Sequence, residues 1–478
     1  MALPVSSELK RQIGLRSAVV LNMLNMVGIG PFITLPLVVA ALGPQAFLGW
    51  ILGAAIAICD GLVWAELGAT MPQAGGSYAF LREIYGPQTG GRLASFLYTW
   101  QLCFSAPLAV ASGCLGMAQY AAYIFPSLRA PFAMHGPLAL VHQTNLLAAA
   151  ACVLIVALLY RNVRAVTRLA WFLFAGMLLT IGTVILAGLT HFHADLAFGA
   201  ASSSFHLNTT FFHALGAATL ITTYDYWGYY NVCFLGGEVR NPGKTIPRAI
   251  LIGIAIVACL YLLLNLSVMG VMPWREMAAA ATTDGRLAII SVVLERTLGH
   301  AAGRILALLV MWTAFASVFA LLLAFSRVPY VAARDGNFFA VFGRLHPKHT
   351  FPHISLLTLG TVATLFCFFN IAQLIAALVT IRIILQFLLQ QIGVIVLRRR
   401  EPNRERPFRI WLYPLPPVLA LIGFCFVLFS RPNPSRELLW GVLIALSGSA
   451  IFFVRSWLRH EWPFASNSRS SSTEPSLP

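Results

Sequence analysis

The 478-residue chain is 59% hydrophobic and only 10% charged, and its mean hydropathy is +0.79. About a quarter of the residues of a soluble globular domain are charged, so this composition excludes a protein that folds entirely in water. The formal net charge of +16 would suit a nucleic-acid-binding protein, but the basic residues are distributed in a way that predicts no nucleic-acid partner.

Apolar runs long enough to cross a bilayer, roughly 20 residues each, follow one another along the chain. They predict an all-α integral membrane protein with about 12 transmembrane helices. The predicted domains are a cytoplasmic lead (1–16), a transmembrane transporter domain (17–460) and a Ser/Pro-rich disordered cytoplasmic tail (461–478). The predicted spans are 17–41, 44–70, 92–125, 142–160, 166–190, 211–236, 247–272, 302–331, 354–371, 373–397, 411–430 and 437–458. Spans 1–5 thus cover about 17–190, spans 6–10 about 211–397 and spans 11–12 about 411–458, and an amphipathic outer helix is expected within 273–301.

The basic residues predict the topology. If the N-terminus is cytoplasmic, most of the 32 Lys and Arg residues fall on the cytoplasmic side, including the Arg-rich run 398–409. The opposite side has only Arg129, Arg275, Arg286, Arg296, Arg304, Arg431 and Arg436. This asymmetry follows the positive-inside rule and predicts a multi-pass protein of the cell (plasma) membrane with both termini cytoplasmic.

Sequence signals of other chemistries are absent. The chain has no Walker A motif, no HExxH and no nucleophile elbow, which argues against an ATP-driven pump or a membrane protease. All eight cysteines fall inside apolar runs, where they are expected to be small core residues. We therefore expect no enzyme activity, no metal and no cofactor.

The first candidate site lies in span 1, where Asn22 to Pro36 reads NMLNMVGIGPFITLP. Two glycines and a proline in mid-span predict that the helix unwinds at Gly28-Ile29-Gly30. Unwound backbone is tolerated in a bilayer where it lines a cavity, and the half-helix that follows points its positive end at an anionic group. The alternative is a notch of small residues for helix packing.

The second candidate site lies in span 6, where polar and aromatic residues run from Thr222 to Asn231. Such a cluster at mid-membrane depth is expected to face a cavity, in which rings can hold an ammonium group. An interfacial aromatic belt is the alternative, although belts lie near helix ends. Interruptions at matching positions of two halves are also the best sequence pointer to a transporter site.

Four ionisable residues fall within the spans, namely Asp60, Glu66, Asp225 and Arg382. Such residues are costly in a bilayer and suggest function with a partner. Asp60, Glu66 and Asp225 are candidates for coupling or proton relay, and Asp225 is also a candidate for binding a substrate amine. A structural hydrogen bond is the alternative for each acid, above all for Glu66, which could brace a loop.

Several motifs resemble the amino acid–polyamine–organocation permease superfamily over nearly the whole chain. The most specific is the loop Gly237 to Ala249, which looks like the acidic-Val-x-Asn-Pro-x-x-Thr-Ile-Pro-x-Ala loop that follows span 6 in that family. Three further blocks match in order, and they are Ala65–Tyr78, Ser326–Pro347 and Arg406–Pro414.

The resemblance implies a five-plus-five inverted-repeat transporter fold with two additional C-terminal helices and a substrate held between spans 1 and 6. By motif position, Gly28-Ile29-Gly30 matches the family's Gly-Ser-Gly cradle for a substrate carboxylate. Tyr224 matches the gating aromatic, and Gly228 matches a glycine of span 6.

Some residues depart from the common pattern of that family. Ile29 replaces a small polar residue and Pro31 removes an amide, while Asp60 and the pair Tyr226-Trp227 look more like the polyamine–proton symporter branch. Many members have a lysine in span 5 in place of a sodium ion, whereas 171–189 contains none, which leaves the coupling ion open.

We therefore expect a secondary-active transporter that moves amino acids by alternating access with proton coupling. The predicted substrate-binding residues are Val27, Gly28, Ile29, Gly30, Tyr224, Asp225 and Gly228. A symporter of polyamines or other organic cations is the first alternative, and a non-transporting substrate sensor is the second. The lipid bilayer and a small-molecule substrate are the expected partners, and the oligomeric state stays open.

Overall fold

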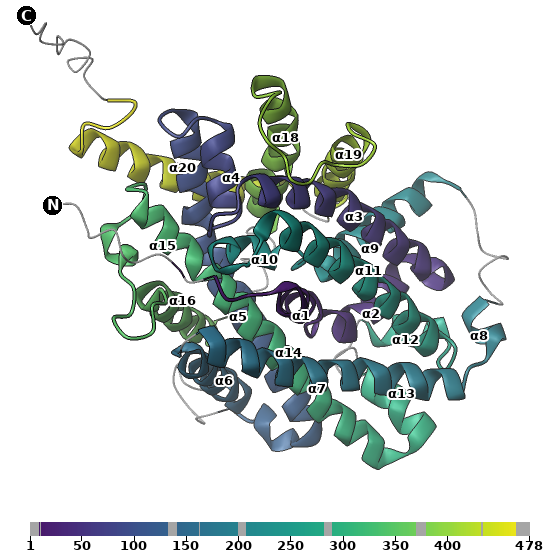
Figure 1. The fold of residues 1–478 in the computed structure, drawn as a ribbon. Helices are drawn as coiled ribbons and strands as arrows, with labels where there is room; N and C mark the ends of the chain where they lie inside the picture. The colour runs from purple at the N-terminus through teal and green to yellow at the C-terminus, as the bar shows by residue number, and fades with distance from the viewer. Residues whose placement is uncertain are drawn as a thin grey trace, which may run out of the picture.

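Helices account for nearly all of the main chain in a computed structural model (Figure 1), which describes residues 9, 11–131, 141–161, 163–198, 207–281, 289–369, 379–431 and 434–464. Within these residues, seven helices are long and apolar enough to cross a membrane, and three shorter helices are also apolar. The prediction of an all-α protein with about 12 membrane spans is confirmed.

The first five spans include one interrupted helix. They are α1 (Leu15–Met26) with α2 (Gly30–Leu42), α3 (Ala46–Thr70), α5 (Gly90–Ile124), α6 (Gln143–Leu159) and α7 (Val163–Thr190). Short elements connect them, namely η1 (Gly43–Gln45), α4 (Ser77–Ile84) and η2 (Pro126–Arg129).

The next five spans repeat this plan. They are α9 (Thr209–Tyr226) with α10 (Asn231–Phe234), α11 (Pro242–Met269), α14 (His300–Phe325), α16 (His353–Phe366), and the π-helix η7 (Ile383–Leu388) continuing into α18 (Leu389–Arg400). Their connecting elements are α8 (Ala194–Phe198), η4 (Gly236–Glu238), α12 (Trp274–Ala280), α13 (Ile289–Leu298), α15 (Arg327–Arg334) and η6 (Ala340–Gly343). The outer segment 273–301 thus contains two helices, where the sequence suggested one.

Local sequence explains where the helices of span 6 and span 7 begin. The side chain of Asn208 caps α9 by accepting a hydrogen bond from the amide of Phe211 at 2.8 Å. Pro242 occupies the first turn of α11. N–H groups in the first turn have no acceptor within the helix, so the missing N–H group of proline costs no hydrogen bond there. The Asn-Pro pair of the loop motif therefore sets the start of span 7.

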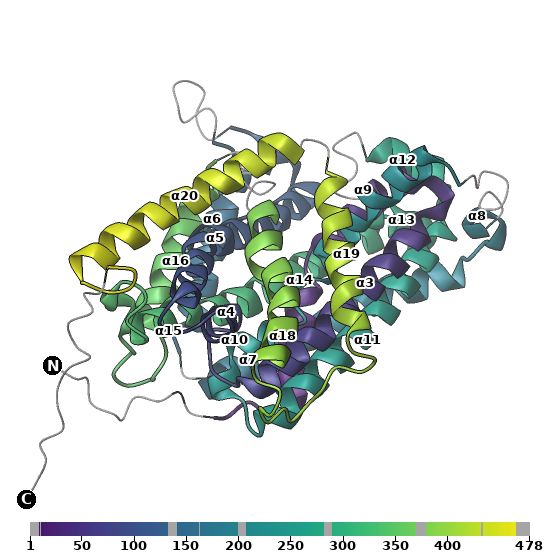
Figure 2. The same cartoon turned by 90° about the horizontal axis from the view of Figure 1, so that it is seen from above.

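Two C-terminal helices, α19 (Leu415–Phe429) and α20 (Pro434–Leu458), lie at the edge of the bundle (Figure 2). Helix α19 packs on α3, α9 and α18, and α20 packs on α5. Large apolar side chains of α20, such as Leu439, Leu446 and Val454, are exposed. Because no water-soluble helix would expose so many, this face of α20 suits contact with lipid.

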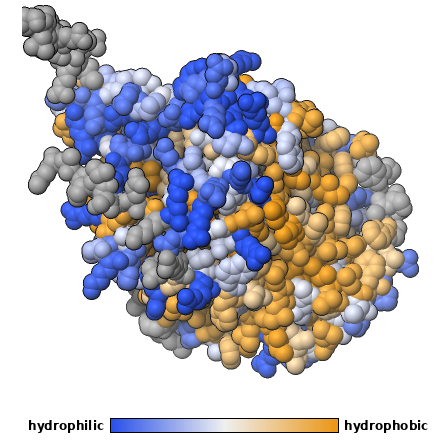
Figure 3. Space-filling view, viewed as in Figure 1, coloured by the Kyte–Doolittle hydropathy of each residue, from blue (hydrophilic) through white to orange (hydrophobic). Residues whose placement is uncertain are grey.

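Hydropathy divides the surface into two regions (Figure 3). Hydrophilic residues gather over α4 and α15, whereas hydrophobic residues cover the neighbouring face over α7 and α11. Side chains of α7 such as Phe172, Leu179 and Leu186 are exposed there. An apolar lateral face beside a polar end is the surface of a protein embedded in a bilayer.

Helix α1 lies at the centre of the bundle (Figure 1), where it packs on α7, α10, α11 and α14. All of its residues from Val20 to Met26 are buried, including the two asparagines Asn22 and Asn25. Buried polar side chains are costly unless they are hydrogen-bonded, so asparagines in a central apolar helix imply specific partners.

At the polar end of the bundle, residues 12 and 13 contact the loop after span 6, which also forms a buried ion pair. The amides of Gln12 and Ile13 both donate to the carbonyl oxygen of Glu238, at 2.8 and 2.9 Å. The Nε of Arg327 donates to Glu238 Oε1 at 2.8 Å, and both side chains are at most 3% exposed. These contacts join the lead, the loop after span 6 and the end of span 8.

Removing Arg327 is expected to destabilise the protein, because Glu238 would be left as a buried, unpaired charge. Truncating one partner of such a pair costs about 3–5 kcal/mol. The Arg327→Ala variant should therefore unfold at a markedly lower temperature than the wild type in detergent. Arg296→Ala is the control, since its pair with Glu276 is more than 40% exposed and should contribute less than about 1 kcal/mol. Equal unfolding midpoints for the two variants would contradict the role of the Arg327 pair.

Candidate functional site

The predicted break in span 1 is confirmed. Helix α1 ends at Met26 and α2 begins at Gly30, with residues 27–29 between them, which we call the first break. The amides of Val27 and Gly28 stay bonded to carbonyl oxygens of α1, at 2.8 and 3.1 Å. The start of α2 has no side-chain cap, Pro31 has no N–H group, and no backbone acceptor among the described residues meets the amides of Ile29 or Gly30. Two amides at the positive end of α2 are therefore free for a ligand.

Span 6 is interrupted at residues 227–230, which we call the second break. Helix α9 ends at Tyr226, Gly228 has a φ of +123°, and α10 begins at Asn231. A Cβ atom on Gly228 would lie 2.8 Å from the backbone of Asn25 and Met26. The second break therefore lies directly against the end of α1. Only glycine tolerates both the positive φ and the lack of space for a Cβ atom at this position.

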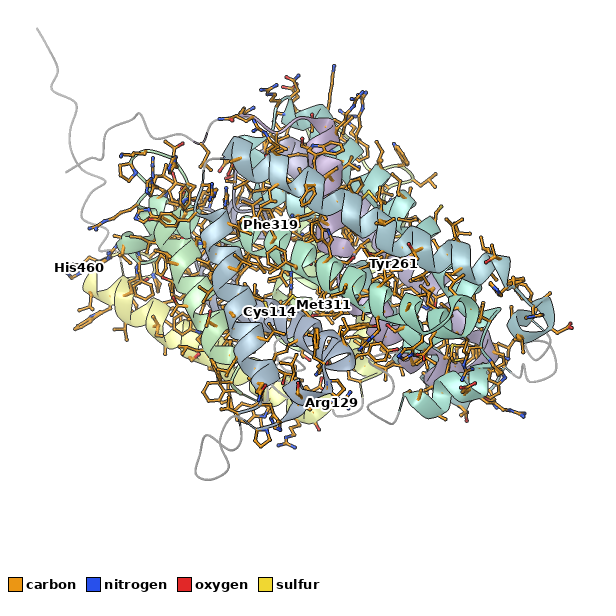
Figure 4. The ribbon with its side chains drawn as sticks, turned by 90° about the horizontal axis from the view of Figure 1, so that it is seen from below. Cys114, Arg129, Tyr261, Met311, Phe319 and His460 are labelled. Atoms are coloured by element: carbon orange, nitrogen blue, oxygen red, sulfur yellow. The ribbon has the colours of Figure 1, made fainter. Side chains whose placement is uncertain are left out.

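Side chains join the two interrupted spans. The amide of Val232 donates to Asn22 Oδ1 at 2.9 Å, and Asn231 Nδ2 donates to the carbonyl oxygen of Leu21 at 3.2 Å. The hydroxyl of Tyr261 lies 2.8 Å from the carbonyl oxygen of Met26 and 3.2 Å from that of Asp225. In Figure 4, Tyr261 lies within the bundle, as do Cys114 and Phe319, whereas Arg129 and His460 lie at its periphery. Sequence reasoning missed these partners.

A cavity of about 240 Å³ lies between the breaks. Its walls come from spans 1 and 6, from α5 and α14, and from Arg382, which directly precedes η7. Six of the predicted substrate-binding residues line it, and they are Gly28, Ile29, Gly30, Tyr224, Asp225 and Gly228. Val27 does not line the cavity, because its side chain is fully buried in the core.

Asp225 has one occupied and one unoccupied carboxylate oxygen. Thr34 Oγ1 donates a hydrogen bond to Oδ2, while Oδ1 has no hydrogen-bond partner among the described residues. A Cβ atom on Gly30 would collide with Oδ1, so this oxygen lies beside the start of α2. The residue is 4% exposed. A buried carboxylate with an unused oxygen facing a cavity is suited to a ligand's ammonium group.

Tyr224 and Ile29 line the cavity with side chains for which no hydrogen bond is found among the described residues. Tyr224 is 38% exposed, and its ring packs against that of Trp227 with centroids 5.3 Å apart. The side chain of Ile29 lies against α5, where a Cβ on Gly116 would approach it within 2.8 Å. Ile29 stands where the family pattern has a small polar residue, and its larger side chain packs against α5 at Gly116.

Arg382 also lines the cavity, a role that its position in the sequence did not reveal. It is 8% exposed, its Nη2 donates to the hydroxyl of Tyr230 at 2.9 Å, and its Nε donates to Gln386 Oε1 at 3.1 Å. The guanidinium carbon lies 5.2 Å from the ring centroids of both Trp227 and Phe325. The sequence had marked Arg382 as an ionisable residue within a span, but not as part of the substrate site.

The other two intramembrane acids lie outside the cavity. Asp60 is fully buried and accepts hydrogen bonds from Tyr229 and Gln391, so it contacts the second break through a residue that does not line the cavity. Glu66 pairs with Arg398 and accepts the amide of Ile410 at 2.8 Å. Glu66 therefore braces the loop before α19, as the structural alternative for this residue suggested.

The described residues contain no group of three His, Cys, Asp or Glu side chains that could hold a metal ion. The charged groups that line the cavity within the described residues are the Asp225 carboxylate and the Arg382 guanidinium group. Polar neutral groups line it as well, among them the amides of Ile29 and Gly30 and the hydroxyls of Thr34, Ser112 and Ser317. This set can bind a small charged organic molecule.

Comparisons with known proteins agree on one family. The family model described as amino acid permease matches residues 13–452. The chain is 26% identical to the serine/threonine exchanger SteT of Bacillus subtilis, in an alignment that covers 93% of this chain and 97% of that protein. It is 27% identical to the human b(0,+)-type amino acid transporter 1 (96% and 91% covered) and to the human Asc-type amino acid transporter 1 (93% and 82% covered).

A methyl group on Gly228 should disrupt the junction of the two breaks. An alanine there would combine a positive φ, which costs about 1–3 kcal/mol, with overlap against the backbone of Asn25 and Met26. Gly228→Ala is expected to lower the unfolding temperature strongly and to reduce the yield of monodisperse protein. Gly182→Ala in α7 is the matched control, because a Cβ there has no atom within 4 Å. A Gly228→Ala protein as stable as the control would refute the close approach.

Proposed function

Because the chain belongs to the amino acid permease family, we propose that it carries amino acids across the membrane, with the cavity between the two breaks as the substrate site. The observation that carries this proposal is the adjacency of the free amides of Ile29 and Gly30 to the unoccupied oxygen of Asp225. An α-amino acid presents a carboxylate and an ammonium group on one carbon. The amides are suited to the carboxylate and Asp225 to the ammonium group.

The size of the cavity supports a small substrate. At about 240 Å³ it lies below the range of about 300–1,000 Å³ that is typical of drug-sized ligands. The cavity is lined by both interrupted spans, as expected where discontinuous helices expose their ends to a substrate. Alternating access would then consist of movements of the surrounding helices about this site. The polar end, with the Arg327–Glu238 pair, is a candidate inner gate.

We further propose that transport is coupled to protons. Asp225 and Asp60 are buried, and no basic side chain among the described residues lies within ion-pair distance of either one. Buried acids without a cationic partner are suited to taking up and releasing a proton. Exchange of one amino acid for another is the second candidate, which is favoured by the name of the Bacillus relative.

The orientation follows from the distribution of charge. The polar end of the bundle includes the lead, α15 and the Arg-rich segment after α18. Placing this end in the cytoplasm follows the positive-inside rule and would leave both termini there, in a multi-pass protein of the plasma membrane. A polyamine remains the alternative substrate, and a sensor that binds without transport is the alternative function.

Proteoliposomes provide the test of amino acid transport. A thermal-shift screen against amino acids and polyamines selects a ligand, and uptake of that labelled ligand is then measured. Asp225→Asn should lower uptake at least about tenfold, since a hydrogen bond to a charged group contributes about 1.5–3 kcal/mol. Asp195→Asn on α8 is the control, because Asp195 is exposed and does not line the cavity. Stabilisation by polyamines alone would overturn the proposed substrate, and binding without uptake would favour the sensor.

Coupling is tested in the same vesicles by imposing a pH gradient, acidic outside, in the absence of internal amino acid. Proton coupling predicts accumulation of substrate above its external concentration, which a protonophore abolishes. Exchange predicts uptake only when unlabelled amino acid is present inside. An uptake rate that is the same with and without the pH gradient would exclude proton coupling.

A further inference from the structure

Arg382 is a buried cation in the cavity that has no acidic partner among the described residues. Its hydrogen bonds go to the neutral side chains of Tyr230 and Gln386. Aromatic rings of Trp227, Tyr230 and Phe325 surround the guanidinium group. A charge that is removed from water without a counter-charge is strongly destabilising, so an anion in the cavity would recover part of that cost.

The guanidinium group is also held in a fixed orientation. Nε and Nη2 are each bonded, while Nη1 has no hydrogen-bond partner within the described segments. The π-helix η7 begins at the next residue, and Gln386, one of the two acceptors, belongs to it. Single π-helical turns inside longer helices are frequent at functional sites. This support leaves one guanidinium nitrogen for a ligand in the cavity.

A place for the amino acid's own carboxylate already lies beside Asp225, at the amides of Ile29 and Gly30. The α-ammonium and α-carboxylate groups share one carbon, so their binding groups must be adjacent, as Asp225 and Gly30 are. Arg382 is not within ion-pair distance of Asp225, and it is held by side chains of the second break and of η7. Arg382 is thus a second charged group of the cavity, separate from the pairing of Asp225 with the start of α2.

We infer that Arg382 binds a carboxylate on the substrate's side chain, so that the transporter selects acidic amino acids over their neutral amides. This inference rests on the proposed function and narrows its substrate class. It also disfavours polyamines, since a polycation would have to lie beside a buried guanidinium group. Asp225 would hold the α-ammonium group, the amides of Ile29 and Gly30 the α-carboxylate, and Arg382 the distal carboxylate.

The experiment compares isosteric pairs that differ in charge. Uptake of labelled glutamate is measured in proteoliposomes in competition with glutamine, and uptake of aspartate in competition with asparagine. The wild type is expected to prefer the acid of at least one pair by about tenfold or more. Putrescine should compete with neither acid.

Substitutions at Arg382 separate charge recognition from structural support. Arg382→Gln should abolish the preference for the acid while uptake of the neutral amide persists, and Arg382→Lys should retain the preference with weaker affinity. Arg275→Gln is the control, because Arg275 is exposed on α12 and lies outside the cavity. Size-exclusion profiles and unfolding temperatures show which variants are folded.

The outcomes distinguish the two proposals. If no amino acid is taken up, the proposed function fails. If neutral amino acids are taken up and the wild type does not prefer the acid of either pair, the inference is wrong and the proposed function stands. If an acid is preferred but folded Arg382→Gln keeps that preference, Arg382 is structural and the inference is wrong. If Arg382→Gln does not fold, the preference of the wild type and its retention in Arg382→Lys decide.

Discussion

Two interrupted helices can lie in the apolar interior of a membrane only if their free backbone groups have partners, and this constraint organises the protein. The side chains of Asn22, Asn231 and Tyr261 bond to backbone groups of both interrupted spans. Gly228 allows the two breaks to come into backbone contact. Some groups beside these bonds stay unbonded among the described residues, including Asp225 Oδ1 and the amides of Ile29 and Gly30, and all three residues line the cavity.

The three intramembrane acids show how surroundings set the role of a carboxylate. Glu66 has two arginines within 4 Å and a backbone amide, which makes it a structural brace near the polar end. Asp60 is bonded to neutral donors and contacts the second break through Tyr229. Asp225 alone keeps an unused oxygen towards the cavity. The number of hydrogen bonds already made therefore separates the three acids better than their depth in the membrane does.

Sequence patterns predicted the parts of the fold that depend on local chemistry. Runs of apolar residues indicated the spans, and Gly28, Gly30 and Pro31 indicated the first break, because glycine and proline weaken a helix wherever they occur. The bonds of Asn22 to Val232 and of Tyr261 to Met26 could not be predicted, since each joins residues more than 200 positions apart. The same holds for Arg382, whose place in the cavity depends on how span 10 packs against span 6. Side-chain identity indicated that these residues need partners, but only the tertiary fold determines which ones.

The two charged residues of the cavity, Asp225 and Arg382, come from different spans. Asp225 lies at the C-terminal end of α9 and beside the N-terminal end of α2. Arg382 is bonded to the second break through Tyr230 and to span 10 through Gln386. A ligand that bridges the two would therefore connect span 1, span 6 and span 10 at once. Movement of span 6 relative to span 10 would change the distance between the two charges, and so the affinity for a bridging ligand of fixed length would depend on the conformation of the bundle.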